Sequence, residues 1–265
     1  MITKSKKLGI IAAGQSNIDG RVPVAQLPQA IHLPLTNCHY CSNHTPNHKQ
    51  GQFQPALSAA DLSEGRFGFD LITYYYLTQL AHQEIYVMKY AEGGTSIDPT
   101  GDGDHHWTTH FDQLPSLDDS LLAKFDQLVQ QCLAQEGDQI EVQAMLWHQG
   151  EADRDRYSKA AADHYAANLK QVFAHCRQLV AKPQLPIFCG TVSHNSEQFD
   201  PQVDLAIRQL AAADNNVHLV DMQAGTLLDP YHFDARSSVY FGQQVYNYFI
   251  DAGIVTGEKL TIPAL

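Results

Sequence analysis

Short apolar runs alternate along the chain with longer amphipathic segments. The runs are typical of buried strands, because the strands of a parallel sheet are covered on both faces. The amphipathic segments have the period of helices that pack on such a sheet. The predicted strands are 8–13, 84–90, 140–147, 186–191 and 217–221, and the predicted helices are 69–82, 117–135, 157–180, 203–213 and 238–250.

This order predicts an α/β fold with a doubly wound, five-stranded parallel sheet and helices on both faces. No internal repeat or linker interrupts the pattern, so residues 1–265 are expected to form one domain. A chain of this length can bury a large core. Residues 21–55 are polar with little periodicity, and we interpret them as a long loop over the carboxyl end of the first strand.

Composition excludes several classes of partner. A formal net charge of -12 argues against binding to nucleic acid or an anionic membrane surface, and no apolar run is long enough to span a membrane. Lysines in residues 1–7 resemble the start of a signal peptide, but cleavage after the apolar run would remove the first strand. We therefore expect an intracellular, cytoplasmic protein, or a mature form whose leader was not included. The five scattered cysteines are expected to be reduced thiols.

A polar cluster, Gly14-Gln15-Ser16-Asn17, stands where the first predicted strand ends. Open α/β sheets bind ligands at the carboxyl ends of their strands, so Ser16 is a candidate nucleophile. The alternative is that Ser16 only caps the next helix. Gly93 and Gly94 follow the second predicted strand, where they either turn a backbone N–H towards an oxyanion or form a plain turn.

The third predicted strand runs into His148-Gln149-Gly150-Glu151. The Gln149 amide can donate a hydrogen bond and the Glu151 carboxylate can accept one from an imidazole; the alternative is a turn with a capping acid. Asp229 and His232 follow the last predicted strand. Side by side, His232 can take a proton from a serine while Asp229 holds its other nitrogen. The alternative is a turn begun by Asp-Pro, and His194 is a second candidate histidine.

Two loops have residues that suit metals. Cys38, Cys41, His44 and His48 have zinc-like spacing, and His106 and His110 are four residues apart. A single Cys-x-x-Cys with two nearby histidines is weaker than a paired signature, and a solvated loop is the better interpretation of residues 100–110. We therefore expect no metal and no organic cofactor.

Three motifs together are distinctive: Gly14-Gln15-Ser16-Asn17, Trp147-His148-Gln149-Gly150-Glu151 and Asp229-Pro230-Tyr231-His232. They resemble the motifs of SGNH hydrolases, and among these the sialate O-acetylesterase-like group and carbohydrate esterase family 6, which includes acetyl xylan esterases. The resemblance covers the chain from the first strand to the last helix and implies a flavodoxin-like three-layer sandwich. The Gly-x-Ser-x-Gly elbow of ordinary α/β-hydrolases is absent around Ser16.

The resemblance also implies roles for the oxyanion hole. Ser16 matches the nucleophile, and its backbone N–H the first oxyanion donor. The Gly93-Gly94 pair matches the second donor, with Gly94 as the first candidate and Gly93 as the alternative. Gln149 matches the third donor, where many SGNH enzymes carry asparagine.

For proton transfer, the resemblance makes His232 the general base and Asp229 the acid that orients it. Glu151 lies in the third conserved block of such enzymes and is an alternative partner for His232. Residue type and loop position make Arg66 and Trp107 candidates for substrate binding, Trp107 as a stacking surface for a sugar.

The expected function is a serine esterase that removes O-acetyl groups from carbohydrates through an acetyl-serine intermediate. Its partner would be a small-molecule or oligosaccharide substrate, and the net charge suits neutral acetylated xylan fragments better than sialic acid. The alternatives are a sialate O-acetylesterase, a broad short-chain esterase, a non-catalytic carbohydrate-binding protein and a metal-dependent hydrolase.

Overall fold

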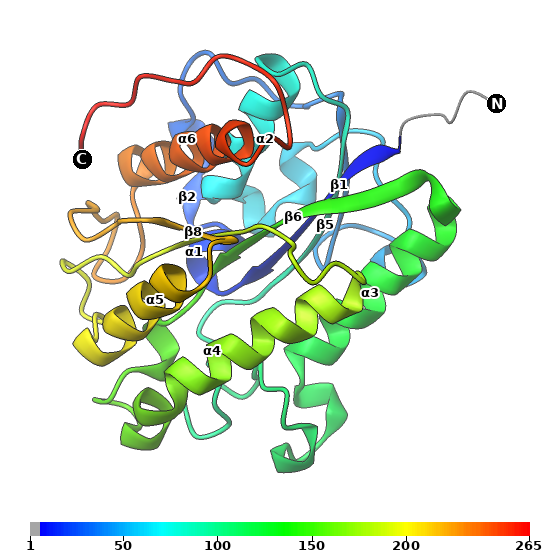
Figure 1. Cartoon of the computed structure of the whole chain (residues 1–265). Coiled ribbons are helices and arrows are strands. Elements are labelled where there is room, and N and C mark those ends of the chain that lie inside the picture. The colour runs from blue at the N-terminus through cyan, green and yellow to red at the C-terminus, as the bar shows by residue number, and fades with distance from the viewer. Residues whose placement is uncertain (1–5) are drawn as a thin grey trace.

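A six-stranded, all-parallel sheet forms the centre of the protein, in a computed structural model that describes residues 6–265 (Figure 1). The strand order is β3-β5-β1-β6-β7-β8. The strands are β1 (Lys7–Gly14), β3 (Cys38–Ser42), β5 (Ile85–Ala91), β6 (Ile140–His148), β7 (Ile187–Gly190) and β8 (Val217–Val220). Most of the lysine-bearing segment considered as a signal peptide, residues 1–5, lies outside the described residues.

Helices cover both faces of this sheet. Figure 1 shows α2 (Phe69–Gln79) and α6 (Ala235–Asp251) together on the upper face. The opposite face is covered by α3 (Leu121–Glu136), α4 (Lys159–Leu179) and α5 (Pro201–Ala213). Each face has its own apolar core, one built with α2 and α6 and the other with the remaining three helices. The predicted doubly wound α/β class is thus confirmed.

The sheet has one strand more than predicted, because β3 lies inside the segment 21–55 that was expected to be a loop. β3 pairs in parallel with β5 at the edge of the sheet. Its Cys38 and Tyr40 side chains enter one core and its Cys41 side chain the other. The run has no β-branched residue, so its composition gave little strand signal. Burial on both faces therefore makes this segment a strand.

Several element boundaries differ from prediction because side chains cap the helices. The Ser120 side chain accepts from Ala123 N–H, so α3 begins after it and residues 117–119 form a separate 3-10 turn. The Asp234 side chain caps α6, which begins three residues earlier than expected. The short elements are α1 (Ser16–Asp19), β2 (Val22–Pro23), β4 (Arg66–Phe67) and the 3-10 turns η1 (Val24–Gln26), η2 (His48–Gln50), η3 (Ala59–Asp61), η4 (Ser63–Gly65), η5 (Phe111–Gln113), η6 (Leu117–Asp119), η7 (Gly137–Gln139) and η8 (Glu151–Asp153).

The register brings the polar motifs to one edge of the sheet. β1 lies between β5 and β6, and Gly14 pairs with Ala91 on one side and His148 on the other. Of the strands that follow β1 in the chain, β3 and β5 lie on one side of it and β6, β7 and β8 on the other. β1 therefore marks the topological switch point, where open α/β sheets form their ligand crevice. Residues that follow these three strands are therefore neighbours.

All five cysteines are free and buried, as expected for reduced thiols. None of the helices in the described part of the chain has the length and apolar character that a membrane crossing requires.

Candidate active site

Ser16 is the first residue of the single-turn helix α1, directly after the sharp turn that ends β1. Gln15, not Ser16, is the N-cap residue of α1, so the capping role is not what places this serine. The Gln15 N–H donates to His148 O at 2.9 Å. Gly14 has φ +136°, and a Cβ there would lie 2.1 Å from the same carbonyl oxygen, so only glycine fits. The Ser16 residue is 4% exposed at the carboxyl edge of the sheet.

Asn17 ties this turn to two distant segments. Its Oδ1 atom accepts from the Phe233 N–H at 2.9 Å, and its Nδ2 atom donates to Glu151 Oε1 at 2.8 Å. Phe233 directly follows His232, so one buried amide fixes the histidine loop beside the turn that carries Ser16.

Asp229 and His232 form a hydrogen-bonded pair. His232 Nδ1 lies 2.8 Å from Asp229 Oδ2, and Asp229 Oδ1 accepts from the backbone N–H groups of Tyr231 and His232. Burial by itself would raise the pKa of Asp229, but these hydrogen bonds and the imidazole hold it below its usual value. An ionised Asp229 accepts the Nδ1–H, which leaves the Nε2 lone pair of His232 available as a base.

Glu151, the alternative partner for His232, instead contacts His148 and Asn17. Its Oε1 atom lies 3.0 Å from His148 Nε2, and the residue is 1% exposed. Burial raises the pKa of Glu151, but His148 and the hydrogen bond from Asn17 outweigh it, so that the pKa lies below its usual value. Of the two acids, the structure brings Asp229 to His232.

The glycine pair after β5 lies against the nucleophile turn. A Cβ on Gly93 would be 3.4 Å from Ser16 Cβ, whereas one on Gly94 would meet nothing within 4 Å. Gly94 has φ +72°, which favours glycine. Among the described residues, the backbone N–H groups of Ser16, Gly93 and Gly94 make no hydrogen bond, so all three are available to a ligand.

Gln149 is not placed as predicted. Its Nε2 atom donates to Asp153 Oδ2 at 2.6 Å and to Thr95 O at 3.2 Å. Both amide hydrogens are thereby used, and the prediction that Gln149 supplies the third oxyanion donor is wrong for this arrangement. Asp153, four residues further along, is the acceptor that competes for the amide, and burial raises its pKa to about 7.

Of the two predicted substrate-binding residues, Trp107 differs from expectation, whereas substrate binding by Arg66 stays a prediction. Trp107 is 0% exposed; its Nε1 donates to Thr95 Oγ1, and its ring packs edge-to-face on Trp147. The prediction of a sugar-stacking surface at Trp107 is therefore wrong, because no face of the ring is accessible. Arg66, in β4, pairs with Glu64 at 2.7 Å, and no hydrogen bond or ion pair joins its side chain to the Ser16 turn.

The metal candidates are dispersed. Cys38 and Cys41 face opposite cores, His44 pairs with Asp19, and His48 contacts Thr45 O. Within residues 6–265, no three His, Cys, Asp or Glu side chains are grouped as a metal site would need. Two other candidate histidines have contacts of their own: His106 with Ser96, and His194 with Phe199 and Asp204.

Arg21 is a residue of the site that sequence reasoning missed. A Cβ on Gly93 would lie 2.1 Å from Arg21 Nη2, so the guanidinium group occupies the space beside Gly93 and the Ser16 turn. Its only signal in the sequence was a position five residues after Ser16 in a segment expected to be a loop.

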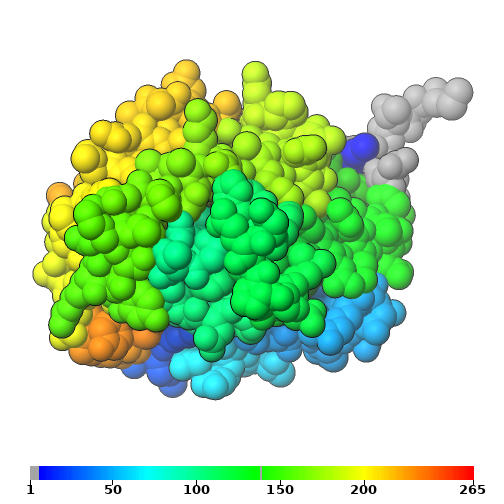
Figure 2. Space-filling view, turned by 90° about the horizontal axis from the view of Figure 1, so that it is seen from below, coloured from blue at the N-terminus to red at the C-terminus, as the bar shows by residue number. Residues whose placement is uncertain are grey.

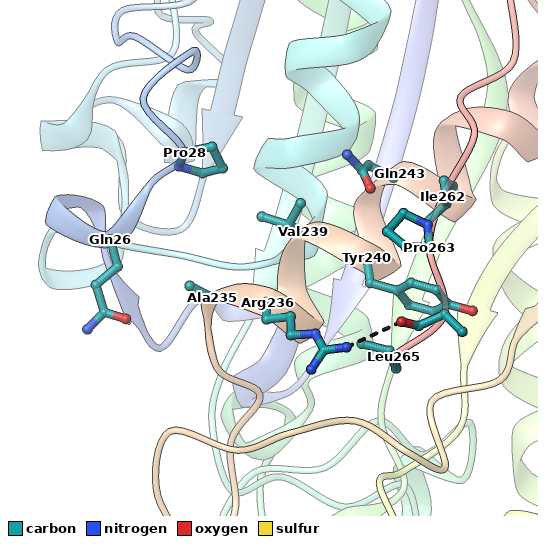
Figure 3. A pocket seen from close by; sticks show the side chains of 11 residues that line it. Gln26, Pro28, Ala235, Arg236, Val239, Tyr240, Gln243, Ile262, Pro263 and Leu265 are labelled. Atoms are coloured by element: carbon teal, nitrogen blue, oxygen red, sulfur yellow. Dashed lines mark hydrogen bonds between the residues drawn. The ribbon is translucent and has the colours of Figure 1, made fainter.

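Two hollows can be compared with this site. One, of about 310 Å³, is lined by Arg154, Arg156, Tyr157, Glu197, Gln198 and Tyr231, and so adjoins the His232 loop. The other, of about 330 Å³, lies between α6, the turn at Gln26 and Pro28, and the C-terminal residues, where Arg236 donates to Ala264 O (Figure 3). None of the candidate residues lines it, so it is separate from the site.

From below, the surface is formed largely by the middle of the chain, in teal and green (Figure 2).

The turn bearing Ser16, the Asp229–His232 pair and the free N–H groups lie at one edge of a doubly wound sheet, an arrangement that suits a serine esterase. A family model described as "Carbohydrate esterase, sialic acid-specific acetylesterase" matches residues 6–251, and the chain belongs to this family. It is therefore a carboxylic ester hydrolase that acts as an acetylesterase on carbohydrates. No curated protein matches the sequence.

Similar solved structures support the fold. A protein from Arabidopsis thaliana has 19% identity and a TM-score of 0.68, over 93% of this chain and 98% of that one. XAC1771, a carbohydrate acetylesterase from Xanthomonas citri, has 15% identity and a TM-score of 0.57, over 92% of this chain and 56% of that one. NanS has 16% identity and a TM-score of 0.55, over 96% and 98%.

Proposed function

We propose that the protein releases acetate from O-acetylated carbohydrates through an acetyl-Ser16 intermediate, with His232 as general base and Asp229 as its orienting acid. The observation that carries the proposal is the Asp229–His232 pair, which Asn17 ties to the Ser16 turn. A serine hydroxyl is a weak nucleophile near neutral pH and needs such an imidazole to accept its proton.

In the first half of the reaction, Ser16 Oγ attacks the acetyl carbonyl carbon and its proton passes to His232 Nε2. The carbonyl oxygen becomes an oxyanion, which the free N–H groups of Ser16 and of Gly93 or Gly94 stabilise. The C–O bond to the sugar then breaks, and His232 returns the proton to the leaving sugar oxygen. The result is a free hydroxyl on the sugar and acetyl-Ser16.

In the second half, His232 takes a proton from water, which attacks the acetyl-serine carbonyl. Collapse of this second oxyanion returns the proton to Ser16 Oγ and releases acetate. No electron is gained or lost, so these steps need only the ester and water.

Two observations bear on the sugar. The net charge of -12 favours neutral substrates such as acetylated xylo-oligosaccharides. The family description, together with two arginines in the hollow beside Tyr231, favours O-acetyl sialic acid as a second candidate. Exposed Tyr157 and Tyr231 offer aromatic faces to either ring.

The test is acetate release from acetylated xylo-oligosaccharides, O-acetyl sialic acid and an aryl acetate, measured for wild type and Ser16→Ala. We expect the variant to lose at least about 1,000-fold in kcat, since it lacks the nucleophile. Ser116→Ala, which removes a cap from the exposed turn η6, is the control and should retain activity. Full activity of Ser16→Ala would reject the mechanism. A chain-length series of aryl esters separates an acetylesterase from a broad short-chain esterase.

A further inference from the structure

The oxyanion of the proposed reaction lacks a side-chain donor if Gln149 is engaged elsewhere. Gln149 donates both amide hydrogens to Asp153 and Thr95. Turning the amide over would direct its oxygen at the Thr95 carbonyl oxygen, which can only accept, so this orientation is fixed by its surroundings. The Gln149 amide is therefore not available to the oxyanion.

The Arg21 guanidinium group lies at the right place. The Cβ position of Gly93 is 2.1 Å from Arg21 Nη2 and 3.4 Å from Ser16 Cβ, so the cation and the nucleophile flank one point above Gly93. The Arg21 side chain is 16% exposed, which leaves its charge poorly hydrated. Any side chain at position 93 would displace it.

Arg21 is held by one end and open at the other. Its Nη1 atom donates to Asp19 Oδ2 at 2.6 Å and to Gly20 O at 2.7 Å. Among the described residues, its Nη2 and Nε atoms have no acceptor. A guanidinium group carries five donors, so donors on two of its nitrogens remain for a ligand.

Asp19, the anchor of Arg21, is itself fixed. It is 4% exposed, its Oδ1 atom lies 2.7 Å from His44 Nε2, and its backbone oxygen accepts from Lys89 Nζ at 3.4 Å. Burial raises the pKa of Asp19, but His44, Lys89 and Arg21 together lower it below its usual value. The acid therefore stays ionised and keeps the guanidinium group in place without help from a substrate.

We propose that Arg21 is a catalytic residue whose Nη2–H donates to the acetyl carbonyl oxygen as that oxygen becomes negative. The inference rests on the proposed acetyl-serine mechanism and deepens it. Arg21 stays protonated throughout, because the Ser16 proton moves to His232. A fixed positive donor in a site of low hydration stabilises developing charge more than the neutral carbonyl, so it acts on kcat.

The experiment compares wild type with Arg21→Met on a neutral aryl acetate, which has no sugar to bind. We expect kcat to fall on the order of 100-fold, as for loss of one oxyanion donor, with a smaller change in KM. Millimolar guanidinium ion should restore part of the lost rate. Thermal unfolding of each variant shows whether it is folded.

Arg177→Met is the matched control. Arg177 is 14% exposed and pairs with Asp214, but it lies near the end of α4, away from the Ser16 edge. Its loss should change stability and leave kcat as in wild type. Where Arg21→Met does not fold, Arg21→Lys replaces it, and a loss is still expected because one ammonium cannot hold Asp19 and reach the Nη2 position.

The opposing outcomes are distinct. Wild-type kcat on the aryl acetate in the folded Arg21 variant would overturn the inference while leaving the acetyl-serine mechanism intact. Loss confined to acidic sugars would also overturn it, since Arg21 would then bind a substrate carboxylate. Failure of the mechanism itself would show separately, as full activity in Ser16→Ala.

Discussion

Asp229 and Glu151 are both carboxylates three residues from a histidine, yet their surroundings give them different tasks. Asp229 is half exposed in a turn, where its carboxylate accepts hydrogen bonds from His232 Nδ1 and from two backbone N–H groups. Glu151 is buried between His148 and Asn17. The first arrangement suits the base of the proposed mechanism, whereas the second joins three segments inside the protein.

Exchange of each acid for its amide separates these tasks. Asp229→Asn should lower kcat roughly 100- to 10,000-fold, because the amide cannot hold His232 in the required tautomer, with little change in the unfolding temperature. Glu151→Gln should instead destabilise the fold by about 3 kcal/mol, because the buried carboxylate that contacts His148 and Asn17 is removed. Steady-state kinetics and thermal unfolding of both variants check this. A kcat loss limited to Glu151→Gln would reverse the assignment.

At the scale of elements, η8 is the connection that fixes the loop after β5. Asp153 in η8 accepts from the N–H groups of Ile97 and Asp98 at 2.8 and 3.0 Å, and from Gln149. Burial nevertheless raises the pKa of Asp153 from 3.8 to about 7. The buried acid that accepts one Gln149 hydrogen is thus costly to ionise.

This raised pKa predicts a pH dependence of stability. Between about pH 4 and pH 7 the folded state retains the Asp153 proton that the unfolded state has lost. The stabilisation from this group is therefore complete below about pH 4 and is lost as the pH rises through 7. Denaturant unfolding of wild type and Asp153→Asn across this range should show that the unfolding free energy of wild type, relative to that of the variant, falls with rising pH. A constant difference would contradict the prediction.

At the scale of the molecule, sheet order assembles the site from distant parts of the chain. Ser16, Gly93 and Gln149 follow β1, β5 and β6, which are neighbours at the switch point. The loop before α6 adds His232, held there by Asn17. Because β1 lies between β5 and β6, the residues of the proposed reaction gather around its carboxyl end.

The same arrangement bears on the metal-dependent alternative. Cys38 and Cys41 are separated by the sheet, and His44 is used by Asp19. We expect wild-type acetate release to be unchanged after exhaustive dialysis against a chelator, with a zinc-dependent esterase treated in parallel as the positive control. Loss of activity that returns on adding zinc would favour the metal-dependent hydrolase.

Periodicity predicted five of the six central strands and the helices between them, because burial on both faces leaves apolar runs that are visible locally. It missed β3, whose cysteines and tyrosine are buried because distant parts of the chain form an apolar core on each face of the sheet. Helix ends depended on single capping side chains such as Ser120 and Asp234.

The sequence by itself determined the α/β class and, through three motifs, the candidate nucleophile, base and orienting acid. These are properties of local pattern and spacing. Only the tertiary structure decided what each side chain can reach. In this structure the Gln149 amide donates to Asp153, Trp107 is buried, Glu151 contacts His148 and Arg21 lies beside the Ser16 turn. Hydrogen-bond partners and burial are set by residues far apart in the chain, so no local pattern contains them.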